Sequence, residues 1–69
     1  MPDTFTNAEK AKCARREVGL RKRVYPRWID NLRLKPEGAA REIALMEAIA
    51  EDYERLAEAD RQAATPTLL

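Results

Sequence analysis

Lys35-Pro36-Glu37-Gly38 divides the chain into two long runs of helix-forming residues and thereby decides its fold. Proline lacks a backbone N–H and disfavours helical backbone at the residue before it, so an incoming helix has to end before Pro36. Proline also suits the first turn of a helix, where the acidic Glu37 would lie near the positive end of the helix dipole. The stretch therefore predicts a turn followed directly by a second helix over residues 36–63.

The first helix is predicted to begin at a capping box. Thr6-Asn7-Ala8-Glu9 places a hydroxyl and a carboxylate three residues apart, so each side chain can bond to the backbone N–H of the other residue. Good helix formers continue to Leu34, interrupted by Gly19 and Pro26. Either the helix bends at Pro26 or it stops there and a short second segment begins. Because the apolar register continues past Pro26, one helix over residues 7–34, kinked near Pro26, is favoured.

Most apolar residues of the first helix fall on one stripe roughly 100° wide. They are Ala11, Ala14, Val18, Tyr25, Trp28, Ile29 and Leu32. Arg21 interrupts this stripe and must reach solvent, pair with an acid or mark an interface. A second apolar strip, formed by Cys13, Leu20 and Val24, lies on the opposite side of the basic residues from the stripe. A helix that is apolar on two sides often has two neighbours, so this strip predicts a further contact surface.

The second helix carries an apolar arc roughly 160° wide, which is more than one neighbouring helix covers. The sequence therefore predicts an all-α, two-helix antiparallel hairpin that dimerises into a four-helix arrangement. Ten large side chains are assigned to the core or the dimer contact. They are Val18, Tyr25, Trp28, Leu32, Ile43, Leu45, Met46, Ile49, Tyr53 and Leu56. Residues 1–69 would form one domain, with a disordered tail over residues 64–69.

The size and cysteine content also favour a homodimer. A core built from 69 residues is marginal, and scaffolds of this size usually need disulfides, a metal or oligomerisation. Cys13 is the only cysteine and the chain has no histidine, so neither an internal disulfide nor a structural zinc site is expected. Oligomerisation remains, and no metal or other cofactor is predicted.

The residue types that are missing argue against catalysis. The chain contains neither serine nor histidine, which removes the Ser–His and Cys–His arrangements in which a base activates a nucleophile. Its two glycines, Gly19 and Gly38, cannot form a glycine-rich phosphate loop. No stretch approaches the roughly 20 apolar residues of a membrane span, and residues 1–6 carry no signal sequence. We therefore expect a cytoplasmic protein that is not an enzyme and does not enter a membrane.

The charge is divided between the two halves. Residues 1–35 hold ten basic and four acidic residues, whereas residues 36–69 hold three basic and eight acidic residues, so a net charge of +1 conceals +6 and −5. Seven cations lie on one arc of the first helix, roughly 140° wide. They are Lys12, Arg15, Arg16, Lys22, Arg23, Arg27 and Arg33. The second helix carries a row of acids at 3-4 spacing, Glu47, Glu51, Glu54 and Glu58.

Three interpretations of the basic arc stay open. It pairs with the acidic helix and only holds the hairpin together, or it binds an acidic host protein, or it binds nucleic acid. Binding to a protein is favoured and nucleic acid is kept as the alternative. The acidic helix would repel the phosphates of a nucleic acid unless it faced away from them. Tyr25 and Trp28 flank the arc, and burial in the core is favoured for them over a role as binding anchors. The residues predicted to contact a partner are Arg15, Arg16, Lys22, Arg23, Arg27, Leu20 and Val24.

Two stretches carry a resemblance to known proteins. Arg15-Arg16-Glu17-Val18-Gly19-Leu20-Arg21-Lys22-Arg23-Val24-Tyr25-Pro26-Arg27-Trp28 and Arg41-Glu42-Ile43-Ala44-Leu45-Met46-Glu47-Ala48-Ile49-Ala50-Glu51-Asp52-Tyr53 resemble a family of short proteins encoded by bacteriophages and prophages. In length and helical character the chain is also similar to phage-encoded quorum-sensing anti-activators. That similarity implies an inhibitor in the host cell that binds a LuxR-type transcription regulator, blocking its DNA binding, and also binds the type IV pilus assembly ATPase.

Overall fold

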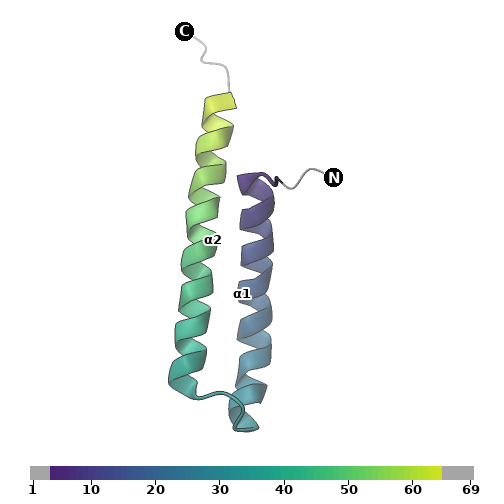
Figure 1. Ribbon diagram of the computed structural model, residues 1–69, viewed down its shortest axis with the longest axis vertical. Helices are drawn as coiled ribbons and strands as arrows, with labels where there is room; N and C mark the ends of the chain where they lie inside the picture. The colour runs from purple at the N-terminus through teal and green to yellow at the C-terminus, as the bar shows by residue number, and fades with distance from the viewer. Residues whose placement is uncertain (1–3, 65–69) are drawn as a thin grey trace.

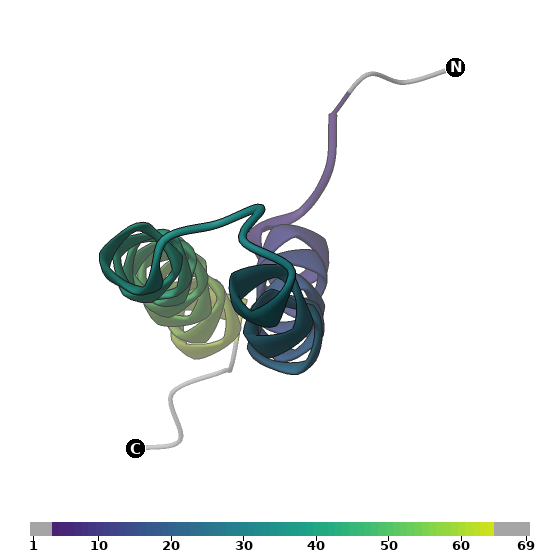
Figure 2. The same cartoon turned by 90° about the horizontal axis from the view of Figure 1, so that it is seen from below.

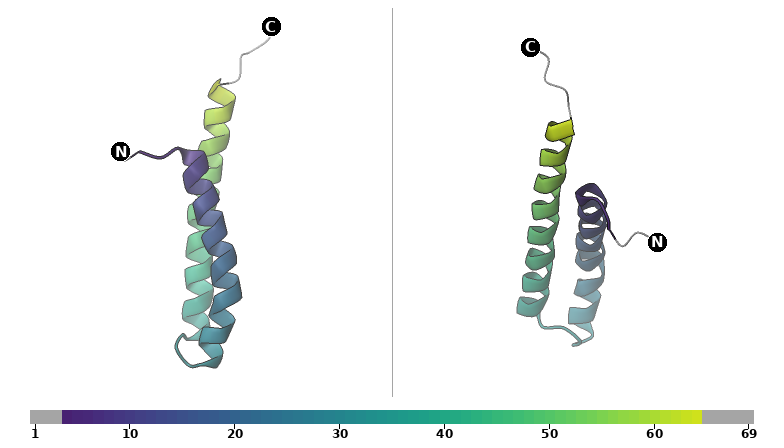
Figure 3. Two further views of the ribbon diagram at one scale, coloured as in Figure 1. Left: turned by 90° about the vertical axis from the view of Figure 1, so that its right-hand side faces the viewer. Right: turned by 45° about the horizontal axis from the view of Figure 1, so that its top comes forward.

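A computed structural model describes residues 4–64 as two antiparallel helices joined by a short turn (Figure 1). Helix α1 spans Asn7–Asp30 and helix α2 spans Pro36–Ala64, and no strand occurs among the described residues. The helices lie side by side along α1, and α2 continues beyond the start of α1 (Figure 3). Viewed from below, they form a single layer that is open on both faces (Figure 2). The predicted all-α hairpin is confirmed.

Helix α1 begins at the predicted capping box. The Thr6 hydroxyl accepts a hydrogen bond from the backbone N–H of Glu9, and the Glu9 carboxylate accepts one from the backbone N–H of Thr6, both at 3.0 Å. Two backbone donors that the first turn cannot satisfy are thereby paired. The start of α1 at Asn7 follows directly from the sequence.

Pro26 lies inside α1, so the chain takes the continuous helix of the two alternatives and the kink stays a prediction. The helix ends at Asp30, however, and not at Leu34 as predicted. Two hydrogen bonds close its last turn, from the N–H of Leu32 to the Ile29 carbonyl at 3.0 Å and from the N–H of Arg33 to the Trp28 carbonyl at 2.8 Å. This pair of bonds is the Schellman motif, which ends a helix through a residue in left-handed backbone.

Leu32 is that left-handed residue, and its predicted place in the core is wrong. Its φ is 59°, a conformation in which glycine is usual and a Cβ is strained. Its side chain is 92% exposed. The prediction placed Leu32 on the apolar stripe by continuing the helix to Leu34, and the early end of α1 turns it away.

Small side chains make the contact between the helices. The buried residues are Ala11, Ala14, Val18, Ala39, Ala50 and Ala57, and Met46 packs against the group at their centre. Small side chains let two helix backbones approach closely. Of the large residues predicted for the core, only Val18 is buried, while Tyr25, Ile43, Met46 and Tyr53 are half-buried.

The remaining large apolar residues lie at the edges of this contact. Leu20, Trp28, Leu45, Ile49 and Leu56 are between 37% and 52% exposed. A place in the core of a single hairpin is therefore wrong for Trp28, Leu45, Ile49 and Leu56. Two helices cover only the narrow stripe between their axes. At the other end of the chain, Ala64 belongs to α2, and the rest of the predicted tail lies outside the described residues.

Replacing Leu32 with glycine is expected to stabilise the hairpin by about 0.5–1 kcal/mol, because glycine adopts the left-handed backbone without the steric penalty of a Cβ. Urea unfolding followed by circular dichroism measures the change. Leu32→Ala is the matched control, since it shortens an exposed side chain but keeps the Cβ, and its stability should stay within about 0.5 kcal/mol of the original. A destabilised Leu32→Gly variant would show that the Leu32 side chain stabilises the turn.

Candidate interaction surfaces

Charged side chains bridge the helices on one side of the hairpin, which we call the charged face. Arg15 holds Glu54 through two bonds, Nε to Oε2 at 2.9 Å and Nη2 to Oε1 at 2.7 Å. About two helical turns nearer the loop that joins the helices, Lys22 Nζ lies 3.7 Å from Glu47 Oε1. The side-chain hydrogen bond from Arg15 lowers the pKa of Glu54, and the same bond raises the pKa of Arg15. Two of the predicted partner-binding residues, Arg15 and Lys22, are thus used within the hairpin.

Four other predicted cations remain on the solvent side of α1. We call Lys12, Arg16, Arg23 and Arg27 the outer basic surface, and all four are exposed. None of them forms an ion pair with another residue in the described part of the chain, although Arg16 Nη2 lies 3.8 Å from the Cys13 sulfur. The last member of the predicted arc, Arg33, lies in the turn beyond α1. This surface is the strongest concentration of unpaired positive charge in the hairpin.

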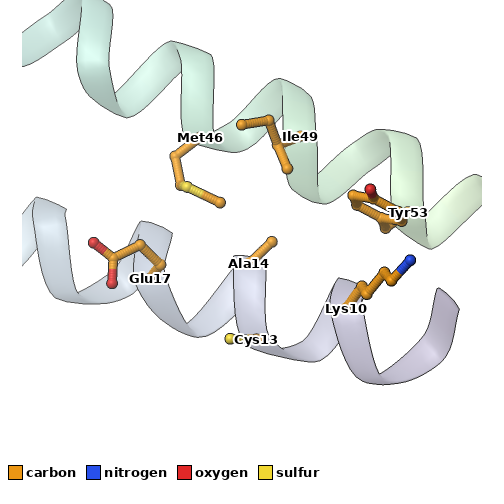
Figure 4. Close-up of a pocket in the computed structure, with 7 residues that line it drawn as sticks. All are labelled: Lys10, Cys13, Ala14, Glu17, Met46, Ile49 and Tyr53. Carbon is orange, nitrogen blue, oxygen red and sulfur yellow. The ribbon is translucent and has the colours of Figure 1, made fainter. Parts of the chain in front are cut away.

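Apolar side chains gather on the opposite side, which we call the apolar face. Its centre is an open groove between the helices (Figure 4). Met46, Ile49 and Tyr53 line it from α2, and Lys10, Cys13, Ala14 and Glu17 line it from α1.

Two further hollows extend this groove along α1. One is lined by Glu17, Leu20, Arg21, Val24, Tyr25 and Trp28, and the other by Phe5, Glu9, Lys10 and Cys13. Because neighbouring hollows share Glu17 or the pair Lys10 and Cys13, they form one continuous face. Leu45 and Leu56 lie four residues before and seven residues after Ile49, which places them on the same side of α2.

The strip of Cys13, Leu20 and Val24 belongs to this apolar face. The sequence predicted it as a separate contact surface, on the far side of the basic arc from the main stripe. In the structure these residues line the same hollows as Ile49 and Trp28. The strip and the exposed flank of α2 are therefore two edges of one surface.

Arg21 interrupts the apolar stripe of α1, and of the three roles predicted for it the structure shows pairing with acids. Its Nε donates to Glu17 Oε1 at 3.0 Å, and its Nη1 donates to the backbone carbonyl of Glu42 at 2.8 Å. A weaker contact of 3.5 Å joins Nη1 to Glu42 Oε2, and the guanidinium lies 6.0 Å from the centre of the Tyr25 ring. Its side chain is only 22% exposed. Arg21 therefore links α1 to the first turns of α2.

Aromatic residues contribute to the apolar face at both ends. Tyr25 and Trp28 stack with ring centres 5.3 Å apart, and Trp28 stays partly open to solvent. At the other end, Lys10 Nζ lies 5.4 Å from the centre of the Tyr53 ring. The sequence favours burial for Tyr25 and Trp28, and the half-buried Tyr25 fits that prediction better than the exposed Trp28 does.

Sequence reasoning missed Phe5 and Lys10 as members of this face. Phe5 immediately precedes the capping residue Thr6, and Lys10 follows four residues after Thr6. An apolar residue before the cap commonly packs against an apolar fourth residue of the helix, so the position of Phe5 was a signal, whereas the charged Lys10 does not fit that pattern. Both side chains line the hollow at the start of α1.

Other kinds of site were sought among the described residues. Within residues 4–64, no group of three acidic or thiol side chains is arranged to hold a metal ion. Neither helix there combines the length and apolar character that crossing a membrane requires. No protein-family model, curated protein or solved structure matches the chain. The two faces and their chemistry are therefore the features of the hairpin that bear on function.

Glu54→Gln is expected to destabilise the hairpin at pH 7 and to lose that effect in acid. The folded state lowers the pKa of Glu54, so its stabilisation is complete above the ordinary value near 4.5 and disappears as the pH falls through the lowered pKa. Thermal unfolding at pH 7 and pH 3 should show the difference from the original protein shrinking at the lower pH. Glu51→Gln, which removes a carboxylate that forms no ion pair in the described region, is the control. A difference that is unchanged at pH 3 would contradict the assignment.

Proposed function

We propose that the protein is a non-catalytic inhibitor of the phage type, which binds host proteins and occupies their working surfaces. The observation that supports this proposal most strongly is the apolar face. Five large apolar side chains, each more than one-third exposed, lie along one side of a hairpin whose own contact buries mainly alanine. Apolar surface gains about 25 cal/mol for each Å² that leaves water, and large contiguous patches mark protein interfaces.

A second copy of the chain is the proposed cover for the apolar face. Two hairpins packed through this face would give the four-helix arrangement that the width of the α2 arc predicts. Two of the ionic groups that line the face, Glu17 and Arg21, are already paired with one another, and Lys10 lies over the Tyr53 ring. The homodimer therefore accounts for exposed side chains that a lone hairpin leaves in water.

Ile49→Glu is expected to convert the dimer to a monomer, because a carboxylate without a partner would be buried in the apolar contact. Sedimentation equilibrium measures the mass, and circular dichroism checks that the helices persist. The matched control is Ala48→Glu, which places the same charge on the neighbouring exposed position outside the apolar face. An Ile49→Glu variant that keeps the dimer mass would place the dimer contact elsewhere.

The outer basic surface is the proposed contact for the host protein. Arginine binds carboxylates through a planar fork and is enriched at the centres of protein interfaces. Arg16, Arg23 and Arg27 have no carboxylate partner among the described residues, so a partner's acids would not compete with bonds inside the hairpin. Leu20 and Val24, which the sequence also assigned to this contact, line the apolar face, so in the proposed dimer they pack against the second copy and the host contact is left to the cations.

The similarity in length and helical character to phage-encoded quorum-sensing anti-activators is what supports particular partners. We propose that a LuxR-type transcription regulator is bound in the host cytoplasm and prevented from binding DNA, and that the type IV pilus assembly ATPase is a second target. Neither target requires chemistry from this chain, since a bound protein can block a surface by occupying it. No cofactor is needed for such inhibition.

Nucleic acid is the alternative partner for the same cations. Lys12, Arg16, Arg23 and Arg27 could contact phosphates, because they face away from the acids of α2. The acidic residues of α2 oppose this interpretation, and the whole chain has a net charge of only +1. The protein partner is therefore the favoured reading of this surface.

One mobility-shift experiment tests both partners. A LuxR-type regulator bound to its operator DNA should lose its shift when the protein is added. The triple variant Arg16→Glu, Arg23→Glu and Arg27→Glu should inhibit at least tenfold less, because each reversal replaces an attraction with a repulsion. Arg41→Glu, which reverses an exposed charge on α2, should inhibit like the original protein.

Lanes without the regulator test the alternative. A shift of the DNA by this protein alone, weakening steeply as salt is raised, would favour nucleic-acid binding. Full inhibition by the triple variant would remove the outer basic surface from the contact, and the absence of inhibition by the original protein would reject the regulator as a target.

A further inference from the structure

The two edges of the apolar face lie at matching heights along the hairpin. The ion pairs Arg15–Glu54 and Lys22–Glu47 mark two levels at which the helices face one another. Cys13 lies two residues before Arg15, and Leu56 lies two residues after Glu54. Because the helices run in opposite directions, both steps lead the same way along the hairpin, by about 3 Å. Cys13 is therefore level with Leu56.

The residues on either side of the second ion pair, Lys22–Glu47, are matched in height in the same way. Leu20 lies two residues before Lys22 and Ile49 two residues after Glu47, so these side chains share a level. Val24 lies two residues after Lys22, and Leu45 lies two residues before Glu47. These two side chains therefore share the next level towards the turn. Every residue of the α1 strip thus has an exposed apolar counterpart at its own height on α2.

Two symmetric ways of packing a second copy on this face exist. A twofold axis along the hairpin brings the turns together and lays α1 of each copy on α2 of the other. A twofold axis across the hairpin sets each turn beside the open end of the other copy and lays α1 on α1 and α2 on α2. A symmetric dimer uses the same surface patch on both copies, and both arrangements satisfy that condition.

Charge distinguishes the two arrangements. Helix α1 holds eight basic and three acidic residues, and α2 holds three basic and eight acidic residues, so they carry +5 and −5. The axis across the hairpin would place each helix on its like-charged counterpart, which is unfavourable. The axis along the hairpin places opposite charges together and also brings the level apolar pairs into contact.

We propose that two copies pack with their turns at the same end, so that α1 of each copy lies against α2 of the other. This arrangement rests on the homodimer proposed above and specifies its geometry. Cys13, Leu20 and Val24 of one copy meet the Leu56, Ile49 and Leu45 positions of the second copy. Each helix then has two neighbours of opposite charge. The outer basic surface lies on the other side of α1 from the groove and stays available to a host protein.

Disulfide formation tests the pairing of Cys13 with position 56 of the second copy. Under mild oxidation, Leu56→Cys should give a species of doubled mass on a non-reducing gel, because cysteines bond only when their Cα atoms are within about 7 Å. Glu51→Cys is the matched control, since it introduces the same thiol on the charged face of α2, and it should keep the monomer mass. A Leu56→Cys chain that stays at monomer mass while sedimenting as a dimer would overturn the arrangement, as would a bridge formed within one chain.

A distance between the two turns provides a second test that leaves Leu56 intact. Lys35→Cys, combined with Cys13→Ser, carries one spin label in the turn of each copy. The proposed arrangement predicts a short distance between the labels, whereas the axis across the hairpin would separate them by about 40 Å, the length of α2. A dimer with the long distance would overturn this arrangement and leave the homodimer in place. A monomer by sedimentation would overturn the homodimer itself.

Discussion

The contact between α1 and α2 is made by alanine, and the rest of the structure depends on that choice. Ala14 and Ala50 form its centre with Val18, and Met46 packs against them, so most of the buried surface between the helices comes from small side chains. Leucine, isoleucine and tryptophan are therefore displaced to the edge of the contact, all on one side. Alanine burial contributes little free energy, because each side chain removes little apolar surface from water. The hairpin alone is thus a weak fold with an apolar surface still exposed, and the proposed dimer uses that surface to complete the core.

Electrostatics explains why the large side chains gather on one side only. The Arg15–Glu54 and Lys22–Glu47 bridges occupy the charged face, whereas the ionic groups that line the apolar face are Glu9, Lys10, Glu17 and Arg21. Arg21 satisfies its donors with Glu17 and with the Glu42 carbonyl, so it links the helices without needing water on every side. The ion pairs Arg15–Glu54 and Lys22–Glu47 therefore lie on the side of the hairpin that the proposed dimer leaves in solvent.

The sequence was sufficient where one local signal decided the outcome. The capping box of Thr6 and Glu9 located the start of α1, and Pro36 located the start of α2. The end of α1 was wrong, because leucine in left-handed backbone is rare and nothing in the sequence marks Leu32 as the closing residue. The sequence alone also could not show which cations of the basic arc are paired with acids of α2. A helical wheel groups Arg15 with Arg16, but only the position of α2 shows that Arg15 is paired with Glu54 and that Arg16 is not.

The proposed binding role fits the way in which these surfaces are distributed over the hairpin. Small proteins that act without chemistry need one surface for their own stability and another for the partner, and the two must not compete. In the proposed dimer the apolar face is the contact between copies, while the outer basic surface points away from both the groove and the acids of α2. In a twofold dimer that second surface occurs twice, so a single assembly presents two equal sites. Two sites on one rigid body raise the effective concentration at a dimeric or oligomeric target, which lets a modest charged contact inhibit well.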